Sequence, residues 1–397
     1  MNRRTFLHRT APLPAAIALA GCAAPEDGTD ARNENESESG AGSGGNVTGT
    51  APIPMLENPP DAVYLPGHRK SMRMLEPVAA GEYRLAPMLT YPHPFWLVTR
   101  TDSQLVEPEA GRGIHLMLVV WDVVTGHVLP IDVSPRATVE GDDGWQRRRS
   151  LWPMLSQEMG LHFGDNITLP GDGTYIVEID LPPVTTRRTG AFAGRFGDGA
   201  TATFEFTYDQ AFRETVVEGI ELLDRERWGE RGALEPMTHG DDGAGRMHSG
   251  IPYSALPSAD EYPGTLLGES DPESRNGLPR IGDAAFVVTL LESGSRLADG
   301  DDRYLLVSPR TPYNRVPLPN MSLRATVDRD GSTVVDHDLV GTLDGEVGFH
   351  YGHSLTDVQP GDSVTITVES PPQVTRHQGY ETAFFELESI ECAVPAE

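Results

Sequence analysis

The sequence predicts an all-β protein made of two tandem β-sandwiches, and three observations support this. Apolar and polar residues alternate over short segments such as 174–181, 203–208 and 364–369, which is typical of strands with one buried face. Gly-Asp and Pro-Gly turn signals precede several of these segments, and the pattern contains no long amphipathic helix. Landmarks of the first half of the chain also recur in the second half.

The internal repeat has a nearly constant spacing. Three landmarks keep their order in both halves, and the first two are displaced by 188 residues (Arg136 to Arg324, His162 to His350). The third, a Pro-Pro pair, returns one residue further along. We therefore predict a first sandwich over residues 62–210 and a second, diverged copy over 276–395. The matching segments are Ser134–Val139 with Ser322–Val327, Gly160–Gly164 with Gly348–Gly352, and Pro182–Pro183 with Pro371–Pro372.

The segment between the two copies, residues 211–275, is longer than a usual loop. We predict a linker rich in Gly, Pro and Asp that could add strands near Val216 to Leu223. The linker also carries four residues with metal-binding side chains, which fit either a plain polar linker or a flexible metal-catching segment. They are Met237, His239, Met247 and His248.

The N-terminus predicts export and a lipid anchor. Arg3-Arg4 followed by Phe6-Leu7 is typical of a twin-arginine (Tat) signal, and the apolar stretch after it is too short to span a membrane. Leu19-Ala20-Gly21-Cys22 resembles a lipobox, in which Cys22 is lipidated after cleavage; a fortuitous cysteine in an ordinary signal peptide is the alternative. We predict a signal peptide over residues 1–21 and a disordered tether over 22–61, which place a lipoprotein on the outer face of the cell membrane.

The charge balance restricts the partners of this 397-residue chain. Acidic residues outnumber basic ones by 59 to 31, the formal net charge is −28, and only Lys70 is a lysine. This excludes nucleic acid, whose phosphates require a basic surface. Such a composition is typical of a halophilic protein, because molar salt screens the self-repulsion of the carboxylates.

The motifs of common enzyme classes are absent. The sequence contains no Gly-x-Ser-x-Gly, no phosphate-binding glycine loop, no His-Glu-x-x-His and no reactive cysteine pair. We therefore expect a protein that is not an enzyme.

Met154 and His162 are the first candidate metal ligands. Eight residues separate them, and Gln157-Glu158-Met159-Gly160 can reverse the chain so that a hairpin brings both side chains together. A thioether combined with imidazoles favours copper, and Fe²⁺ is acceptable to the imidazoles.

A family resemblance supports this chemistry. Leu151-Trp152-Pro153-Met154, the run Gly160–Asn166, Gly173-Thr174-Tyr175 and the pair Pro182-Pro183 together resemble the periplasmic Fe²⁺-transport protein family. The resemblance implies Ig-like sandwiches that bind iron and/or copper, delivery of iron to a membrane permease, and a homodimer. It also implies His93 as a third ligand, whereas we expect Met88 and His115 to be packing or surface residues.

The sequence departs from this family at the loop after the Pro-Pro pair. The first copy has Arg187 and Arg188 where the family has a histidine, and a guanidinium cannot bind a cation. Its site is then incomplete, or Glu158 or Asp165 completes it. The second copy has Thr342 in place of the methionine but carries three histidines, and we expect either a His-only metal cluster or a structural duplicate. These histidines are His350, His353 and His377.

The sequence thus predicts an exported, lipid-anchored protein that binds iron and/or copper and delivers iron to a membrane permease. The alternative is a non-metal Ig-like module that docks another envelope protein. Convergence of the side chains of Met154 and His162 would favour the first interpretation.

Overall fold

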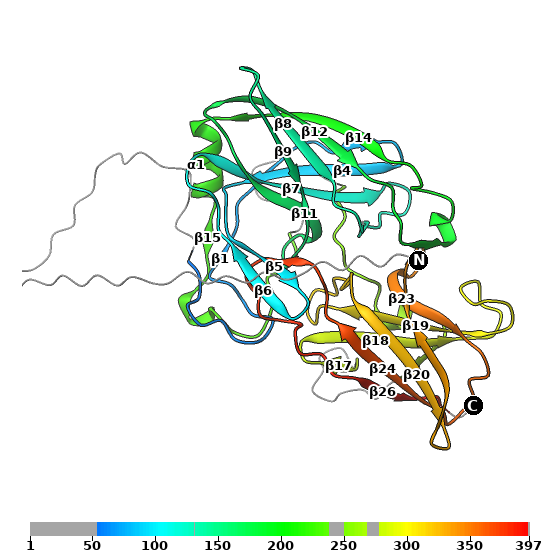
Figure 1. The fold of residues 1–397 in the computed structure, drawn as a ribbon. Helices are drawn as coiled ribbons and strands as arrows, with labels where there is room; N and C mark the ends of the chain where they lie inside the picture. Colours follow the sequence, from blue (N-terminus) through cyan, green and yellow to red (C-terminus); the bar gives the residue numbers. More distant parts are fainter. Residues whose placement is uncertain (1–53, 131, 238–249, 268–277, 396–397) are drawn as a thin grey trace, which may run out of the picture. The chain divides into compact units, whose positions relative to one another are not determined.

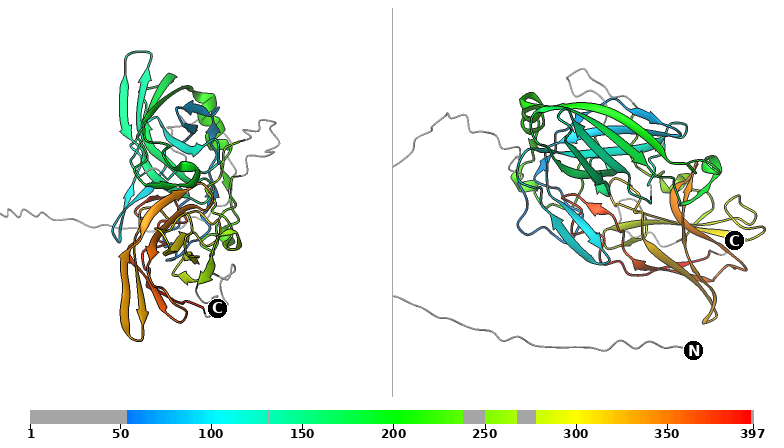
Figure 2. Two further views of the ribbon diagram at one scale, coloured as in Figure 1. Left: turned by 90° about the vertical axis from the view of Figure 1, so that its right-hand side faces the viewer. Right: turned by 45° about the horizontal axis from the view of Figure 1, so that its top comes forward.

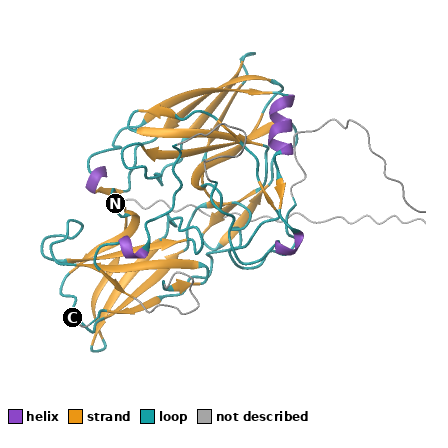
Figure 3. Ribbon diagram, turned by 180° about the vertical axis from the view of Figure 1, so that it is seen from behind, coloured by secondary structure: helices purple, strands orange, loops and turns teal. Residues whose placement is uncertain are grey.

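The computed structural model describes residues 54–130, 132–237, 250–267 and 278–395, and strands dominate them (Figure 3). The predicted signal peptide, Cys22 and the tether up to residue 53 lie outside the described residues. Within the described ranges, no helix is long and apolar enough to cross a membrane. The predicted all-β sandwich fold is confirmed.

The first sandwich consists of two facing sheets, coloured blue to green in Figure 1. Its larger sheet begins with the order β2-β4-β7-β11-β10, with β3 paired to β4, and these strands are β2 (Arg73–Met74), β3 (Val78–Ala80), β4 (Tyr83–Thr90), β7 (Gly113–Asp122), β10 (Trp152–Ser156) and β11 (Gly160–Thr168). The facing sheet has the order β14-β12-β8-β9 and consists of β8 (Arg136–Gly141), β9 (Gln146–Ser150), β12 (Gly173–Leu181) and β14 (Ala200–Tyr208).

The second sandwich repeats this plan in the yellow to red part of Figure 1. One sheet contains β16 (Thr265–Leu267), β17 (Arg280–Ile281), β18 (Ala284–Leu291), β19 (Arg303–Arg310), β22 (Val340–Asp344) and β23 (Gly348–Leu355). The facing sheet contains β20 (Ser322–Arg329), β21 (Ser332–Asp338), β24 (Ser363–Ser370) and β26 (Ile390–Ala393).

The two copies exchange short strands, which the sequence did not predict. The strand β25 (Thr375–Arg376), from the second copy, pairs in parallel with β10 of the first copy. On its other side β25 pairs with β5 (Phe95–Thr99), which forms a hairpin with β6 (Asp102–Val106). Both strands of this hairpin therefore belong to the same sheet, which the right-hand view of Figure 2 shows. In return β13 (Arg187–Thr189), from the first copy, pairs in parallel with β22 of the second.

The register of these exchanged strands corrects the sequence alignment by one residue. Met154 is the partner of Thr375, and Thr342, its counterpart in the second copy, is the partner of Arg187. The displacement is therefore 188 residues here too, so the counterpart of His377 is Thr189 and not Arg188.

The segment after the first sandwich differs from its prediction. Residues Gln210–Glu218 form the helix α1, because the carboxylate of Asp209 accepts a hydrogen bond from the backbone N–H of Phe212 at the helix start. Phe212 and Val216, four residues apart, bury the same helix face. Of the strands expected there, the structure forms only β15 (Glu221–Leu222), which pairs with β1 (His68–Arg69); three short 3-10 helices complete the fold, namely η1 (Gly190–Phe192), η2 (Arg225–Arg227) and η3 (Ala259–Glu261).

Both faces of the larger sheet of the first sandwich are covered. Every residue of β7 is buried, whereas a sandwich strand usually buries one face. Leu116, Leu118 and Val120 point into the sandwich core, and Met117 and Trp121 belong to a separate cluster on the opposite, outer face. The outer face of this sheet is therefore a second buried environment, and it also receives His115 because side chains alternate along a strand.

The loop that carries β25 is organised by the buried Arg376. Its guanidinium donates hydrogen bonds to the carbonyl oxygens of Pro372, Tyr380 and Ala383 and stacks 4.4 Å from the ring centre of Phe385. Arg376 is 0% exposed, so this network fixes the conformation of the exchanged segment.

We expect Arg376→Leu to destabilise the protein by at least about 2 kcal/mol, because it leaves buried carbonyl groups without a donor. Urea denaturation measures the loss. Arg324→Leu, at an exposed arginine of β20 that pairs with Asp336, is the matched control and should change stability little. Equal effects of the two substitutions would contradict the anchoring role of Arg376.

Candidate metal centre

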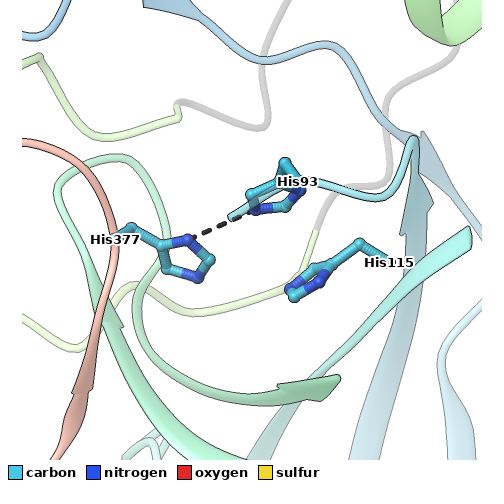
Figure 4. A group of neighbouring side chains, drawn as sticks. All are labelled: His93, His115 and His377. Atoms are coloured by element: carbon cyan, nitrogen blue, oxygen red, sulfur yellow. Dashed lines mark hydrogen bonds between the residues drawn. The ribbon is translucent and has the colours of Figure 1, made fainter. Parts of the chain in front are cut away.

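Four histidines from separate elements meet on the outer face of the larger sheet. His115 lies on β7, His162 on β11, His93 on the loop between β4 and β5, and His377 directly follows the exchanged strand β25. All four are at most 3% exposed. Figure 4 shows His93 and His115 from the first copy with His377 from the second.

Three of these histidines have ring nitrogens at distances that suit a single metal ion. One nitrogen each of His93, His115 and His377 lies within 4.8 Å of the other two. Nε2 of His93 is 3.3 Å from Nδ1 of His377. His162 lies next to this group, with its Nε2 3.1 Å from the other ring nitrogen of His377, Nε2. Two imidazole ligands of a tetrahedral ion, each ~2.0–2.1 Å from it, are separated by about 3.3 Å.

Hydrogen bonds fix the tautomers of three of the rings. Nδ1–H of His93 donates to the carbonyl of Tyr91 (3.0 Å), and Nδ1–H of His162 donates to the carbonyl of Gly160 (3.1 Å). Nδ1 of His115 is 2.9 Å from the amide oxygen of Asn166, which also accepts from the backbone N–H of His93. Each Nε2 is therefore left with its lone pair, which is the form that binds a metal.

Met154 lies beside His162 in the hairpin that the spacing predicted. It is fully buried and is the cross-strand partner of His162 in the β10–β11 hairpin. A Cβ atom at Gly164 would lie 3.1 Å from both the sulfur of Met154 and Nε2 of His115. Glycine at this position therefore leaves the space in which the thioether and the imidazole approach each other.

Burial keeps these histidines uncharged. Desolvation lowers the pKa of His162 to about 4 and that of His115 to about 3. The pKa values of His93 and His377 are also well below the usual range, first because of burial and then because of the nearby charge of Lys70. At neutral pH no proton has to leave before these rings bind a metal.

The one lysine of the chain points at this cluster. Nζ of Lys70 lies 3.1 Å from Nδ1 of His377, and burial lowers the pKa of Lys70 to about 8. Glu158 and Glu381 are close enough to offset part of this desolvation. A metal ion bound to the histidines would be repelled by the ammonium group.

Neither carboxylate expected to complete the site joins the donor set. Glu158 forms an ion pair with Arg69 at 3.3 Å. Asp165 lies between Gly164 and Asn166 on β11, so its side chain points to the opposite face, toward Arg149. Among the residues that the structure describes, the only group of three or more His, Cys, Asp or Glu side chains that could hold a metal consists of histidines.

The second copy does not form the expected His-only cluster. His350 has its Nδ1 on the carbonyl of Gly348 and its Nε2 3.3 Å from the hydroxyl of Tyr304. His353 points to the other face of β23 and stacks on His337 with ring centres 4.3 Å apart. His377 has crossed to the first copy, so the three histidines do not meet.

The strand registers show what replaces the ligands in the second copy. Tyr304 corresponds to His115, Thr342 to Met154 and Thr189 to His377, and only His350 retains its counterpart's residue type. Next to this position the buried carboxylate of Asp344 forms an ion pair with the partly exposed Arg296 at 2.6 Å. The equivalent place is therefore a network of ordinary hydrogen bonds and ion pairs.

Sequence reasoning missed three residues of this site. His115 was expected to be a packing or surface residue, yet it lies in the histidine cluster; a histidine within a mostly apolar strand was the available signal. His68 and Lys70, which lie beside the cluster, gave no signal. Met88, in contrast, packs in the outer-face cluster as expected.

Comparisons with known proteins find one family model that matches part of the chain and two similar solved structures. Residues 260–393 match the family described as "Domain of unknown function (DUF7350)". No curated protein matches the chain significantly. A copper-bound variant of FetP from uropathogenic Escherichia coli is 19% identical over 34% of this chain and 97% of that chain, with a TM-score of 0.25. FetP of the same bacterium, as isolated, is 20% identical over 34% of this chain and 95% of that chain, with a TM-score of 0.24.

We expect the stability of the protein to fall between pH 7 and pH 5. Burial lowers the pKa of His350 to about 4 in the folded state, so the unfolded chain binds more protons below pH ~6.5 and acid favours unfolding. His350→Gln should therefore reduce the loss of unfolding free energy over this interval by about 2 kcal/mol. Urea denaturation at both pH values tests this, and an unchanged pH dependence in the variant would contradict it.

Proposed function

We propose that this protein is a metal-binding protein whose single histidine–methionine centre takes copper in preference to iron. The observation that carries the proposal is the group of three buried, uncharged imidazoles of His93, His115 and His377, with no carboxylate in it. His162 adjoins this group, and its cross-strand partner Met154 adds a thioether. Thioethers select Cu⁺, imidazoles accept Cu²⁺, and affinity for divalent ions rises from Fe²⁺ to Cu²⁺. The site would then bind Fe²⁺ more weakly than copper, since carboxylates are the donors that favour Fe²⁺.

We further propose that the protein is exported and anchored by lipid at Cys22, and that it passes its metal to a membrane permease. The twin-arginine pair and the lipobox-like segment support export and anchoring. The likeness of the motifs around Met154 and His162 to the Fe²⁺-transport family supports the permease as partner, and iron is then a second cargo. The excess of carboxylates suits a chain that works in high salt.

Titration of residues 54–397 with Cu²⁺ and Fe²⁺ in molar KCl tests the metal centre. We expect one Cu²⁺ per chain and weaker binding of Fe²⁺. His162→Ala and His377→Ala should each lower the Cu²⁺ affinity at least about 100-fold, because each removes a ligand. A loss of Cu²⁺ affinity in His377→Ala would mean that the second copy supplies a ligand. If the first copy bound the metal alone, this substitution would leave the affinity unchanged.

The matched control is His350→Ala, which removes the counterpart of His162 in the second copy. It should leave Cu²⁺ binding unchanged. If the wild type binds no more metal than His162→Ala, the metal centre is rejected, and the non-metal interaction module becomes the better interpretation.

We expect Lys70→Gln to raise the Cu²⁺ affinity at least about tenfold. Two unit charges ~4 Å apart at an effective dielectric constant of ~20 repel by ~4 kcal/mol, and the ammonium lies beside His377. Arg69→Gln removes a neighbouring charge that Glu158 already pairs, and it should change the affinity less. Tighter binding in Arg69→Gln than in Lys70→Gln would contradict the repulsion.

A further inference from the structure

Six of the 11 methionines of the chain gather on the outer face of the larger sheet, beside the histidine centre. Met117 lies on β7 directly opposite Gly164, the residue over which Met154 and His115 approach each other. The thioethers therefore continue along the same face from the histidine centre. The six residues are Met72, Met74, Met88, Met117, Met159 and Met237.

A small cavity separates some of these methionines from the histidines. It has a volume of about 40 Å³, which exceeds the ~10–15 Å³ that one water molecule requires. Met72, Met117 and Met159 line it, and His377 forms part of its wall. The cavity is thus large enough for an ion and adjoins a residue of the histidine centre.

His68 supplies an unused ligand in this cavity. Its side chain lines the cavity, is 2% exposed, and has no hydrogen-bond partner at either ring nitrogen. A buried polar group without a partner costs about 1–3 kcal/mol, so its retention requires an explanation. An ion bound by one ring nitrogen would provide that partner.

We propose that this cavity is a second metal site, which binds Cu⁺ through the thioethers of Met72, Met117 and Met159 together with His68. Thioethers are soft, uncharged donors that bind Cu⁺ and are poor ligands for Fe²⁺. Lys70 also lines the cavity, and a monovalent ion meets half the repulsion that a divalent ion would.

The position of the cavity gives this second site a role. His377 borders both sites, so an ion that enters among the thioethers has one imidazole between it and the histidine centre. We infer that the cavity is where Cu⁺ enters the protein. Binding in the cavity is independent of the histidine centre, whereas the transfer step rests on the function proposed above.

Methionine also fills irregular gaps in apolar cores, and the cluster itself contains the control for this simpler role. Met88 belongs to the same cluster and is 1% exposed, but it does not line the cavity. Replacing methionine by leucine conserves volume and usually costs less than ~1.5 kcal/mol, so leucine variants test ligation rather than packing.

Anaerobic titration with Cu⁺ against a chromophoric Cu⁺ chelator tests the second site. We expect two Cu⁺ per chain in the wild type and one in the triple variant Met72→Leu/Met117→Leu/Met159→Leu, with Cu²⁺ binding unchanged. Met88→Leu should still bind two. The single variant Met72→Leu, at a half-buried position, should lower the affinity for the second Cu⁺ at least about fivefold. It still tests the site if the triple variant does not fold.

The double variant Met154→Leu/His162→Ala separates the two proposals. It should lose the histidine centre and still bind one Cu⁺ in the cavity. A triple methionine variant that keeps both Cu⁺ ions, or a Met88→Leu variant that loses one as well, would overturn the second site. Undiminished Cu²⁺ binding in the double variant would instead overturn the histidine centre. The number of Cu⁺ ions bound per chain would then still test the site in the cavity.

Discussion

The parallel pairing of β25 with β10 is the interaction on which the candidate site depends. One backbone hydrogen bond, from the N–H of His377 to the carbonyl of Leu155, sets the position of His377 within the sheet of the other copy. Met154 and Thr375 are partners in the same ladder, so the thioether and the incoming imidazole share one face. Without the exchanged strand, the first copy would have an open sheet edge and no histidine at this place.

The covering of the outer face of the sheet explains why the histidine cluster is buried. A β-sandwich strand normally leaves its outer face in water, yet β7 is buried along its whole length. Covering this face removes water from the imidazoles, which lowers their pKa values and leaves their lone pairs free at neutral pH. The same covering holds the amine of Lys70 against His377, so the cluster combines neutral imidazoles with one positive charge.

The two copies share the β-sandwich scaffold but differ in the residues around the equivalent histidines His162 and His350. His350 keeps the hydrogen bond from its Nδ1 to a carbonyl two residues earlier, as His162 does. Its neighbours have changed, however, because Tyr304 and Thr342 stand where the first copy has His115 and Met154. The second copy therefore contributes a histidine to the cluster of the first copy, and the described residues of the second copy form no such cluster of their own.

The sequence by itself determined the all-β class, the repeat and the hairpin that pairs Met154 with His162, because these depend on local periodicity and on short spacings. It also marked His93 and His377 as candidates, although it assigned His377 to the wrong copy. Only the tertiary structure decided that His377 completes the first copy, because the contact of His162 with His377 spans 215 residues and leaves no periodic trace in the sequence. It likewise decided the one-residue correction at Thr189 and the place of His115, since a strand pattern shows that two faces alternate but not what covers the outer one.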